Sequence, residues 1–332
     1  MRLRGGAASQ VPLRRAASRN DELVRRGGIS AGSARQVKGE AHSVAHACPD
    51  NGHIIGWTTR ERRHVSRPSA QRKGRSTTMM KHQLLRKIHG LLEPRTYFEV
   101  GVRKGRSLTL SRVPSVGVDP YYEVTRELLC DVHLVRTTSD EFFARRHPFA
   151  HLAGQPLDFA FIDGMHLAEY ALRDVINTER HCHAASVIVV DDILPRTVEQ
   201  AGRGRVGAAK NGAWAGDVYK IVDVLRYHRP DLAVIEVDTT PTGTLVILVP
   251  DPQNRTLTDT YEDVVSSLVV ADPQELPEWA ILRTRAVDPA ALLRPELWAV
   301  LRRARSMERQ DAVASIRGAL EHNGLLSHGS AS

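Results

Sequence analysis

Hydrophobic and polar positions follow two rhythms after residue 79. Short apolar runs have the length of buried strands, and longer amphipathic stretches separate them. The stripe formed by Leu84, Leu85, Ile88 and Leu92 predicts a helix over 81–92. Strands are expected over 97–101, 115–119, 132–136, 157–162 and 186–190. The other helices are expected over 105–111, 122–130, 139–146, 167–180 and 217–228.

This alternation predicts an α/β fold. Strands that alternate with helices form a doubly wound, mostly parallel sheet. Two further strands, over 233–238 and 244–249, are joined by Pro241-Thr242-Gly243 and form a predicted hairpin. We therefore expect a Rossmann-like seven-stranded sheet that ends in an antiparallel hairpin. Residues 251–332 have apolar positions at helical spacing and are expected to be C-terminal helices.

The first 78 residues have a different composition. They are rich in Arg, Ala, Gly and Ser, and they contain 16 of the 46 Lys and Arg residues but only five of the 38 acidic residues. Such a segment buries too little apolar surface to offset the entropy of ordering, so we expect a disordered extension. The regular spacing of apolar positions begins only at Met79. We therefore interpret residues 1–78 as an upstream over-extension of the reading frame. A transit peptide and an electrostatic tail for nucleic acid are the alternatives.

Composition excludes several classes of function. The chain has no 18-residue apolar run, so no membrane partner is expected. Residues 79–332 are slightly acidic, which disfavours nucleic acid. Cys48, Cys130 and Cys182 share no metal-type spacing and indicate a reduced, cytoplasmic protein. We divide the chain into the extension 1–78, a catalytic domain over 79–255 and a helical extension over 256–332, which makes a homodimer worth testing.

The first candidate site is a glycine turn. Glu99, Gly101 and Gly105 form a Glu-x-Gly-x-x-x-Gly pattern between a strand and the next predicted helix. The glycines let a ligand approach the backbone closely, and Glu99 would face its polar end. Asp119 ends the next strand, where it can accept hydrogen bonds from ribose hydroxyls. A purely structural turn is the alternative explanation of the glycines.

A second candidate site consists of carboxylates. Asp163 and Asp191 follow two strands that we expect to be neighbours, and Asp192 comes next. Three carboxylates in one crevice repel one another unless a cation neutralises them, and Mg²⁺ prefers such oxygen ligands. The sequence therefore predicts a metal site at Asp163, Asp191 and Asp192. In the alternative interpretation, these residues cap a helix or position a cofactor.

His166 is the candidate general base, together with Asp163 as a second catalytic residue. A neutral imidazole with an ordinary pKa of about 6.5 can take a proton at neutral pH. The alternative is that His166 only shapes its loop. Trp214 lies in a glycine-rich loop, where it is either a lid over the substrate or an anchor.

Several separate blocks resemble class I S-adenosylmethionine-dependent methyltransferases. These blocks are Phe98-Glu99-Val100-Gly101, Val118-Asp119-Pro120, Phe161-Ile162-Asp163-Gly164-Met165-His166 and Val189-Val190-Asp191-Asp192. The third block is similar to a bacterial subfamily, methyltransferase family 24, whose fourth strand ends in Phe-Ile-Asp-Gly-x-His. The spacing from Asp163 to Asp191 also resembles metal-dependent O-methyltransferases of the catechol and caffeoyl-CoA type.

The resemblance implies S-adenosylmethionine as cofactor, with Mg²⁺ as an additional expectation. It implies a methyltransferase fold and methyl transfer to a small-molecule acceptor, with oxygen as the expected acceptor atom. The implied cofactor-binding residues are Glu99, Gly101, Gly105, Ser107, Asp119, Ser139, Asp140 and Asp163. Methylation of RNA or protein, other metal-centred chemistry and a non-catalytic interaction module remain as rival hypotheses, because a fold alone does not fix a function.

Overall fold

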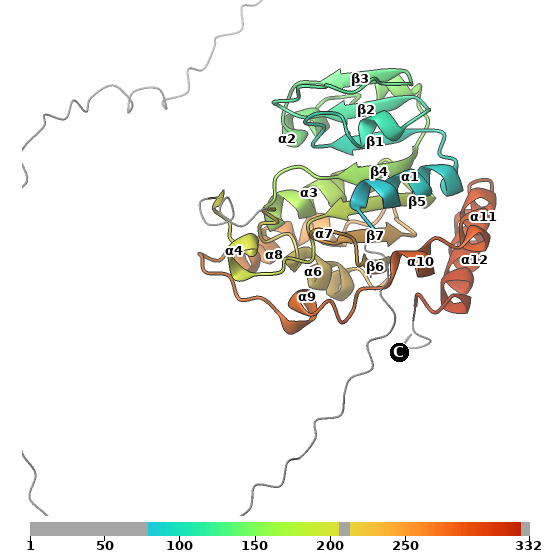
Figure 1. The fold of residues 1–332 in the computed structure, drawn as a ribbon. Helices are drawn as coiled ribbons and strands as arrows, with labels where there is room; N and C mark the ends of the chain where they lie inside the picture. The colour runs from blue at the N-terminus through green and yellow to red at the C-terminus, as the bar shows by residue number, and fades with distance from the viewer. Residues whose placement is uncertain (1–78, 206–212, 327–332) are drawn as a thin grey trace, which may run out of the picture. The chain divides into compact units, whose positions relative to one another are not determined.

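The computed structural model describes residues 79–205 and 213–326 (Figure 1). Its centre is one seven-stranded sheet with the strand order β3-β2-β1-β4-β5-β7-β6. The strands are β1 (Tyr97–Val100), β2 (Ser115–Val118), β3 (Val132–Val135), β4 (Leu157–Ile162), β5 (Cys182–Asp191), β6 (Ala233–Val237) and β7 (Thr244–Leu248). Strand β7 pairs antiparallel with β5 and β6, and the other pairs are parallel. The predicted doubly wound sheet and its terminal hairpin are confirmed.

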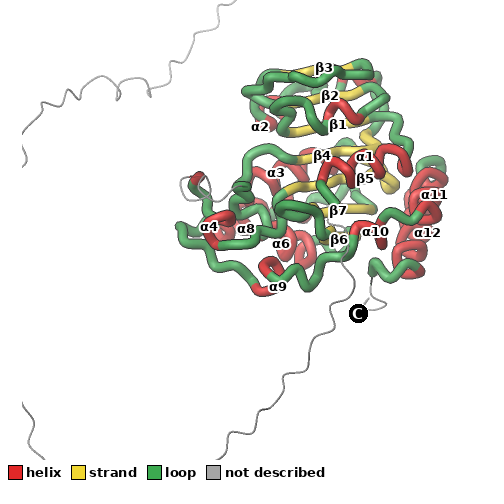
Figure 2. The backbone as a smooth tube through the Cα atoms, viewed as in Figure 1, coloured by secondary structure: helices red, strands yellow, loops and turns green. Residues whose placement is uncertain are grey.

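Helices cover both faces of this sheet (Figure 2). Successive strand residues point to opposite faces, so Phe98 belongs to one apolar cluster and Tyr97 to the other. The cluster around Phe98 includes side chains of α2 (Ser139–Phe143), α3 (Ala168–Glu179), α4 (Val198–Ala201), α6 (Lys220–His228), α7 (Thr256–Asp259), α8 (Tyr261–Leu268) and α9 (Glu278–Ile281). The cluster around Tyr97 includes side chains of α1 (Lys81–Leu92), α10 (Pro289–Leu292), α11 (Pro295–Ala304) and α12 (Arg309–His322).

Helix α1 has the bounds that its apolar stripe predicted, and Leu84, Leu85, Ile88 and Leu92 are fully buried. Its start is fixed to the loop before β7. The Lys81 N–H donates to the Thr240 carbonyl at 3.4 Å, and the Thr240 N–H donates to the Met79 carbonyl at 2.9 Å. The first residue of α1 therefore has a defined place beside the carboxyl end of the sheet.

Two predicted helices are absent. Residues 105–111 form a turn and a single 3₁₀ helix, η1 (Leu108–Leu110), because Gly105 has a φ of +72° and β2 begins only four residues after Ser111. Residues 122–130 form no helix, because backbone N–H groups of this segment form hydrogen bonds with the glycine turn. The Glu123 and Thr125 N–H groups donate to the carbonyls of Arg103 and Lys104, at 2.8 and 3.3 Å. Since each N–H makes one such bond, pairing with the glycine turn replaces helix formation here.

Other boundaries shift by a few residues. Helix α2 ends at Phe143 rather than at 146, and β5 begins at Cys182 rather than at 186. The C-terminal residues contain the predicted helices, from α7 to α12, with non-helical segments between them, and α11 and α12 contact β5 (Figure 1). The domain boundaries at 78 and 255 stay predictions.

Residues 1–78, for which disorder was predicted and which include Cys48, lie outside the described residues. Part of the glycine-rich loop, 206–212, also lies outside them. Within the described ranges, Cys130 and Cys182 are free, as predicted. No helix in those ranges is both long enough and apolar enough to cross a membrane.

Candidate functional site

The glycine turn brings the ends of β1 and β4 into close contact. Gly101 has a φ of +89°, and a Cβ at this position would lie 1.9 Å from the Asp163 carbonyl oxygen. Gly105 also has a positive φ and packs against Val124. The glycines therefore have a structural reason, namely the close approach of two loops. The same turn, from Gly101 to Ser107, lines a cavity of about 350 Å³.

Glu99 is completely buried beneath this turn. The Tyr97 hydroxyl and the Ser107 hydroxyl donate to its two carboxylate oxygens, each at 2.7 Å. Burial raises the pKa of Glu99 to about 8, although the two hydrogen bonds act in the opposite direction. Glu99 thus supports the turn from below, with its oxygens bound to protein hydroxyls.

The other predicted cofactor residues also have partners within the protein. Asp119 accepts the Arg103 N–H at 2.7 Å and the Tyr121 N–H at 2.6 Å, one on each carboxylate oxygen. Asp140 forms a two-pronged ion pair with Arg173, with both N–O distances 2.6 Å. These contacts hold the turn after β1 and the start of α2 in place.

Ser139 is the first residue of α2, and its side chain forms a hydrogen bond with Asp174. Asp174 belongs to α3 and is buried. Burial raises the pKa of Asp174 to about 7 in spite of this hydrogen bond. The contact therefore ties the start of α2 to a buried acid.

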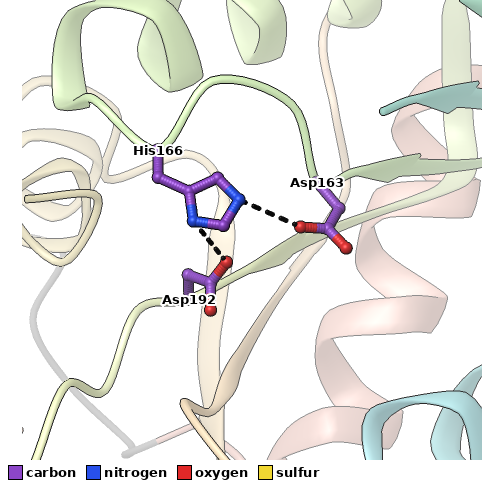
Figure 3. A group of neighbouring side chains, drawn as sticks. All are labelled: Asp163, His166 and Asp192. Carbon is purple, nitrogen blue, oxygen red and sulfur yellow. Dashed lines mark ion pairs between the residues drawn. The ribbon is translucent and has the colours of Figure 1, made fainter. Parts of the chain in front are cut away.

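Asp163, His166 and Asp192 come together at the carboxyl ends of β4 and β5 (Figure 3). The His166 Nε2 lies 3.5 Å from an Asp163 oxygen, and the Nδ1 lies 3.1 Å from an Asp192 oxygen. One ligand atom from each residue lies within 4.8 Å of the others. Two carboxylates and one imidazole are a donor set that can hold a divalent ion. The sequence grouped Asp191 with the two aspartates, whereas the structure places His166 there.

Asp191 faces a cation that sequence reasoning did not identify. The Lys81 ammonium lies 2.7 Å from Asp163 and also forms an ion pair with Asp191. Burial alone lowers the pKa of Lys81, but the charges of Asp191 and Asp163 outweigh burial and raise it. Lys81 is therefore a cation between the two carboxylates. Its position at the start of an amphipathic helix gave no signal of this role.

His166 differs from the neutral base that the sequence predicted. Burial alone lowers the pKa of His166, but the hydrogen bond to Asp163 and the charges of Asp192 and Asp163 outweigh it. The pKa is raised to about 9. The imidazole in this structure is therefore mainly cationic at neutral pH.

Trp214 packs against His166. The two rings are stacked with centroids 4.8 Å apart, and the His166 Nδ1 lies 2.7 Å from the Trp214 carbonyl oxygen. The Trp214 indole N–H donates to the Gly202 carbonyl at 2.7 Å. These contacts describe an anchored side chain that forms part of a cavity wall.

A cavity of about 610 Å³ opens over this group. Asp163, His166, Asp192 and Trp214 are among the residues that line it. Its basic lining residues are Lys81, His82, Arg103, Arg106 and Arg205. The guanidinium groups of the three arginines have no carboxylate partner within 79–205 and 213–326. The rim is thus positively charged.

The two cavities share part of their lining. Lys81, His82, Arg103, Arg106 and Asp163 contribute to both of them. One cavity continues along the glycine turn, and the other continues toward Trp214. This arrangement provides room for two ligands in contact with each other.

Comparison with known proteins adds a family match. A family model described as a methyltransferase domain matches residues 39–193, slightly less than half of the chain. No curated protein matches the chain.

Three solved structures are similar to about half of this chain. Cofactor-bound Rv0187 from MTB is 19% identical, with 51% of this chain and 79% of that chain covered and a TM-score of 0.38. An O-methyltransferase from Bacillus cereus in complex with SAH is 14% identical, with coverages of 51% and 80% and a TM-score of 0.36. The O-methyltransferase TomG from Streptomyces achromogenes, involved in tomaymycin synthesis and in complex with SAM, is 15% identical, with coverages of 51% and 79% and a TM-score of 0.36. The family match spans the glycine turn, Asp163 and Asp192, and together with the sheet order it supports a class I methyltransferase.

Proposed function

We propose that this protein transfers the methyl group of S-adenosylmethionine to an oxygen atom of a small-molecule acceptor. The observation that carries the proposal is the pair of adjoining cavities at the carboxyl ends of β1, β4 and β5, within the part that matches a methyltransferase domain. In an α/β sheet, ligands bind at these strand ends. Holding donor and acceptor next to each other contributes much of the rate in such reactions.

We assign the cofactor to the smaller cavity, along the glycine turn. Gly101, Ser107 and Asp163 line this cavity, and Gly105 shapes it. Asp119 is buried and is not among the residues that line this cavity, but it accepts only one backbone N–H on each oxygen, so it is the proposed acceptor of the ribose hydroxyls beside the turn. Glu99 would act through the turn that it supports.

For the adenine ring, the start of α2 is the proposed contact. Ser139 and Asp140 are its first two residues, and the ion pair with Arg173 holds Asp140 in place. The proposal for these two residues follows the sequence resemblance.

We assign the acceptor to the larger cavity. During transfer, an acceptor oxygen forms a bond to the methyl carbon while the carbon–sulfur bond breaks, and the acceptor gives up its proton. His166 is the proposed proton acceptor in its neutral form, which is the minor form at neutral pH because the pKa is raised to about 9, and Asp163 orients it through the contact with Nε2. The positive rim formed by Arg103, Arg106 and Arg205 favours an acceptor that carries a carboxylate or another anionic group.

A divalent ion fits the donor set Asp163, His166 and Asp192. When bound, such an ion acts as a Lewis acid that lowers the pKa of an acceptor hydroxyl. Mg²⁺ follows from the sequence, and the imidazole makes Mn²⁺ equally suitable. The carboxylates and His166 orient whatever occupies the floor of the cavity.

Calorimetric titration of S-adenosylhomocysteine into the full-length protein tests the cofactor assignment. We expect a micromolar Kd, and Asp119→Asn should weaken binding by about tenfold, or 1.4 kcal/mol. Asp263→Asn, an exposed position on α8, serves as the matched control and should leave the Kd unchanged. No binding to folded wild-type protein would contradict the proposal.

A mass-based assay tests methyl transfer itself. Pairs of hydroxylated aromatic compounds that differ only in a carboxylate group are incubated with the protein and S-adenosylmethionine. We expect a mass gain of one methylene unit, with the carboxylate member of a pair methylated faster. Faster methylation of the neutral member would contradict an anionic acceptor.

A further inference from the structure

Lys81 joins two carboxylates that come from different strands. Asp163 follows β4, Asp191 ends β5, and the Lys81 ammonium forms an ion pair with each. The side chains of Lys81, Asp163 and Asp191 are 19%, 17% and 2% exposed. Two carboxylates in such a site need a compensating positive charge, because burying unpaired charges is costly.

The fold fixes the ammonium in this place. The backbone hydrogen bonds with Thr240 hold the start of α1, and the apolar side of α1 is buried against the sheet. Lys81 therefore reaches the crevice from a rigid element. It differs in this respect from an exposed lysine such as Lys87 on the same helix.

We propose that Lys81 is the permanent cation of the Asp163–Asp191 pair and closes this pair to divalent metal ions. The ammonium takes the place that a metal ion bridging the two carboxylates would need. The inference rests on the geometry of the pair and not on the reaction that the protein performs.

This role leaves the neighbouring group available. Asp163, His166 and Asp192 form the potential metal site among the described residues, and Asp191 is not part of it. An ammonium has three N–H donors, and the structure assigns two of them to Asp163 and Asp191. Because Lys81 lines both cavities, we infer that its remaining donor is available to a ligand oxygen.

Titration of the full-length protein with Mn²⁺, followed by electron paramagnetic resonance, tests the proposal. The variants are Lys81→Met, which removes the charge, Lys81→Arg, which keeps it, and Lys81→Met combined with Asp191→Asn. We expect Lys81→Met to bind Mn²⁺ at least about tenfold more tightly than the wild type, or to bind one additional ion. Lys81→Arg should behave like the wild type, and the double variant should lose the gain. Equal affinity and stoichiometry in the wild type and Lys81→Met would overturn the proposal.

A second measurement does not depend on the folding of Lys81→Met. Asp191→Asn alone should leave the Mn²⁺ affinity of the protein within about twofold of the wild type, because the Asp191 carboxylate is already paired with the Lys81 ammonium. A tenfold loss would show that Asp191 binds metal in the presence of Lys81, and the proposal would then be wrong. Binding of S-adenosylhomocysteine is measured separately, so its failure would contradict the proposed function and not the role of Lys81.

Discussion

Two neighbouring regions of the crevice neutralise their buried acids in different ways. At the β1–β3 side, Glu99 and Asp174 have hydroxyl partners, and burial raises their pKa values to about 8 and about 7. At the β4–β5 side, Asp163 and Asp191 form ion pairs with Lys81. One region gives its acids hydroxyl partners, and the other places a cation between two carboxyl groups, although burial and the neighbouring carboxylates still raise the pKa of Asp191 well above its ordinary value.

Between Glu99 and the Asp163–Asp191 pair, the difference reflects where the partners lie in the chain. Tyr97 and Ser107 are two and eight residues from Glu99, so a local motif supplies its hydrogen bonds. Lys81 is 82 residues from Asp163 and 110 from Asp191, so tertiary folding brings the cation to them. The β1–β3 side should therefore be most sensitive to changes in its backbone turn, and the β4–β5 side to the loss of one charge.

The largest effect is expected for Gly101→Val. The new Cβ would lie 1.9 Å from the Asp163 carbonyl oxygen at a φ of +89°, so the turn must move or the contact must break. We expect a loss of about 4 kcal/mol in the free energy of unfolding and loss of cofactor binding. Urea denaturation measures the first and calorimetry the second. Gly90→Ala, on α1 with nothing within 4 Å of the new Cβ, is the control and should be neutral or slightly stabilising. A fully stable Gly101→Val would contradict the close contact.

Lys81→Met should destabilise the protein by about 3 kcal/mol in the absence of divalent ions. The substitution leaves Asp163 and Asp191 in the crevice without their cation. Urea denaturation in chelator measures the loss, and added Mn²⁺ should restore part of the stability. Lys87→Met, at an exposed position of the same helix, should change stability by less than about 0.5 kcal/mol. Equal stability of the two variants would remove the contrast between the regions.

The pH dependence of stability in Asp174→Asn tests whether the folded protein keeps a proton on this buried acid. The folded protein keeps the Asp174 proton up to pH about 7, whereas the unfolded chain loses it near pH 4. The stability that this raised pKa contributes is therefore present below pH 4 and is lost as the pH rises through 7. Relative to the wild type, Asp174→Asn should gain stability as the pH rises from 4 to 8, by at most about 4 kcal/mol for a shift of about three pKa units. Urea denaturation at several pH values measures it, and an unchanged difference across this range would show that Asp174 is ionised in the folded protein.

The smallest effect is expected for charge reversal at two lining residues, which tests which of the two cavities binds the cofactor. Lys104 lines only the smaller cavity, and Arg205 lines only the larger one. Lys104→Glu should weaken binding of S-adenosylhomocysteine by about tenfold, or 1.4 kcal/mol, because the amino-acid carboxylate is then repelled. Arg205→Glu should leave the Kd within about twofold. The opposite order, measured by calorimetry, would place the cofactor in the larger cavity.

Sequence patterns predicted much of the fold. Each strand run of the sheet was found, since a buried strand needs only a short apolar segment with a boundary at each end. The two absent helices failed for a tertiary reason. The N–H groups of Glu123 and Thr125 pair with the glycine turn, and local periodicity does not reveal such a competitor.

The sequence also predicted one part of the candidate site and missed another. The sequence grouped Asp163, Asp191 and Asp192 as carboxylates of one crevice, with His166 as a separate candidate base nearby, whereas the structure brings His166 into a group with Asp163 and Asp192. It did not place Asp191 opposite Lys81, and it gave His166 an ordinary pKa, whereas the surrounding carboxylates raise it to about 9. Electrostatic environments depend on all nearby charges, most of which are distant in the chain.

The succession of strands along the chain, the hairpin and the glycine turn were predictable from local patterns, because each of these depends on residues that are close together in the chain. The packing of distant elements fixes which cation pairs with which carboxylate and which arginines line the larger cavity. The start of α1 must first pack beside the ends of β4 and β5 before Lys81 can reach Asp163 and Asp191. No periodicity in a sequence encodes that meeting, because the residues belong to separate elements that only the packed sheet brings together.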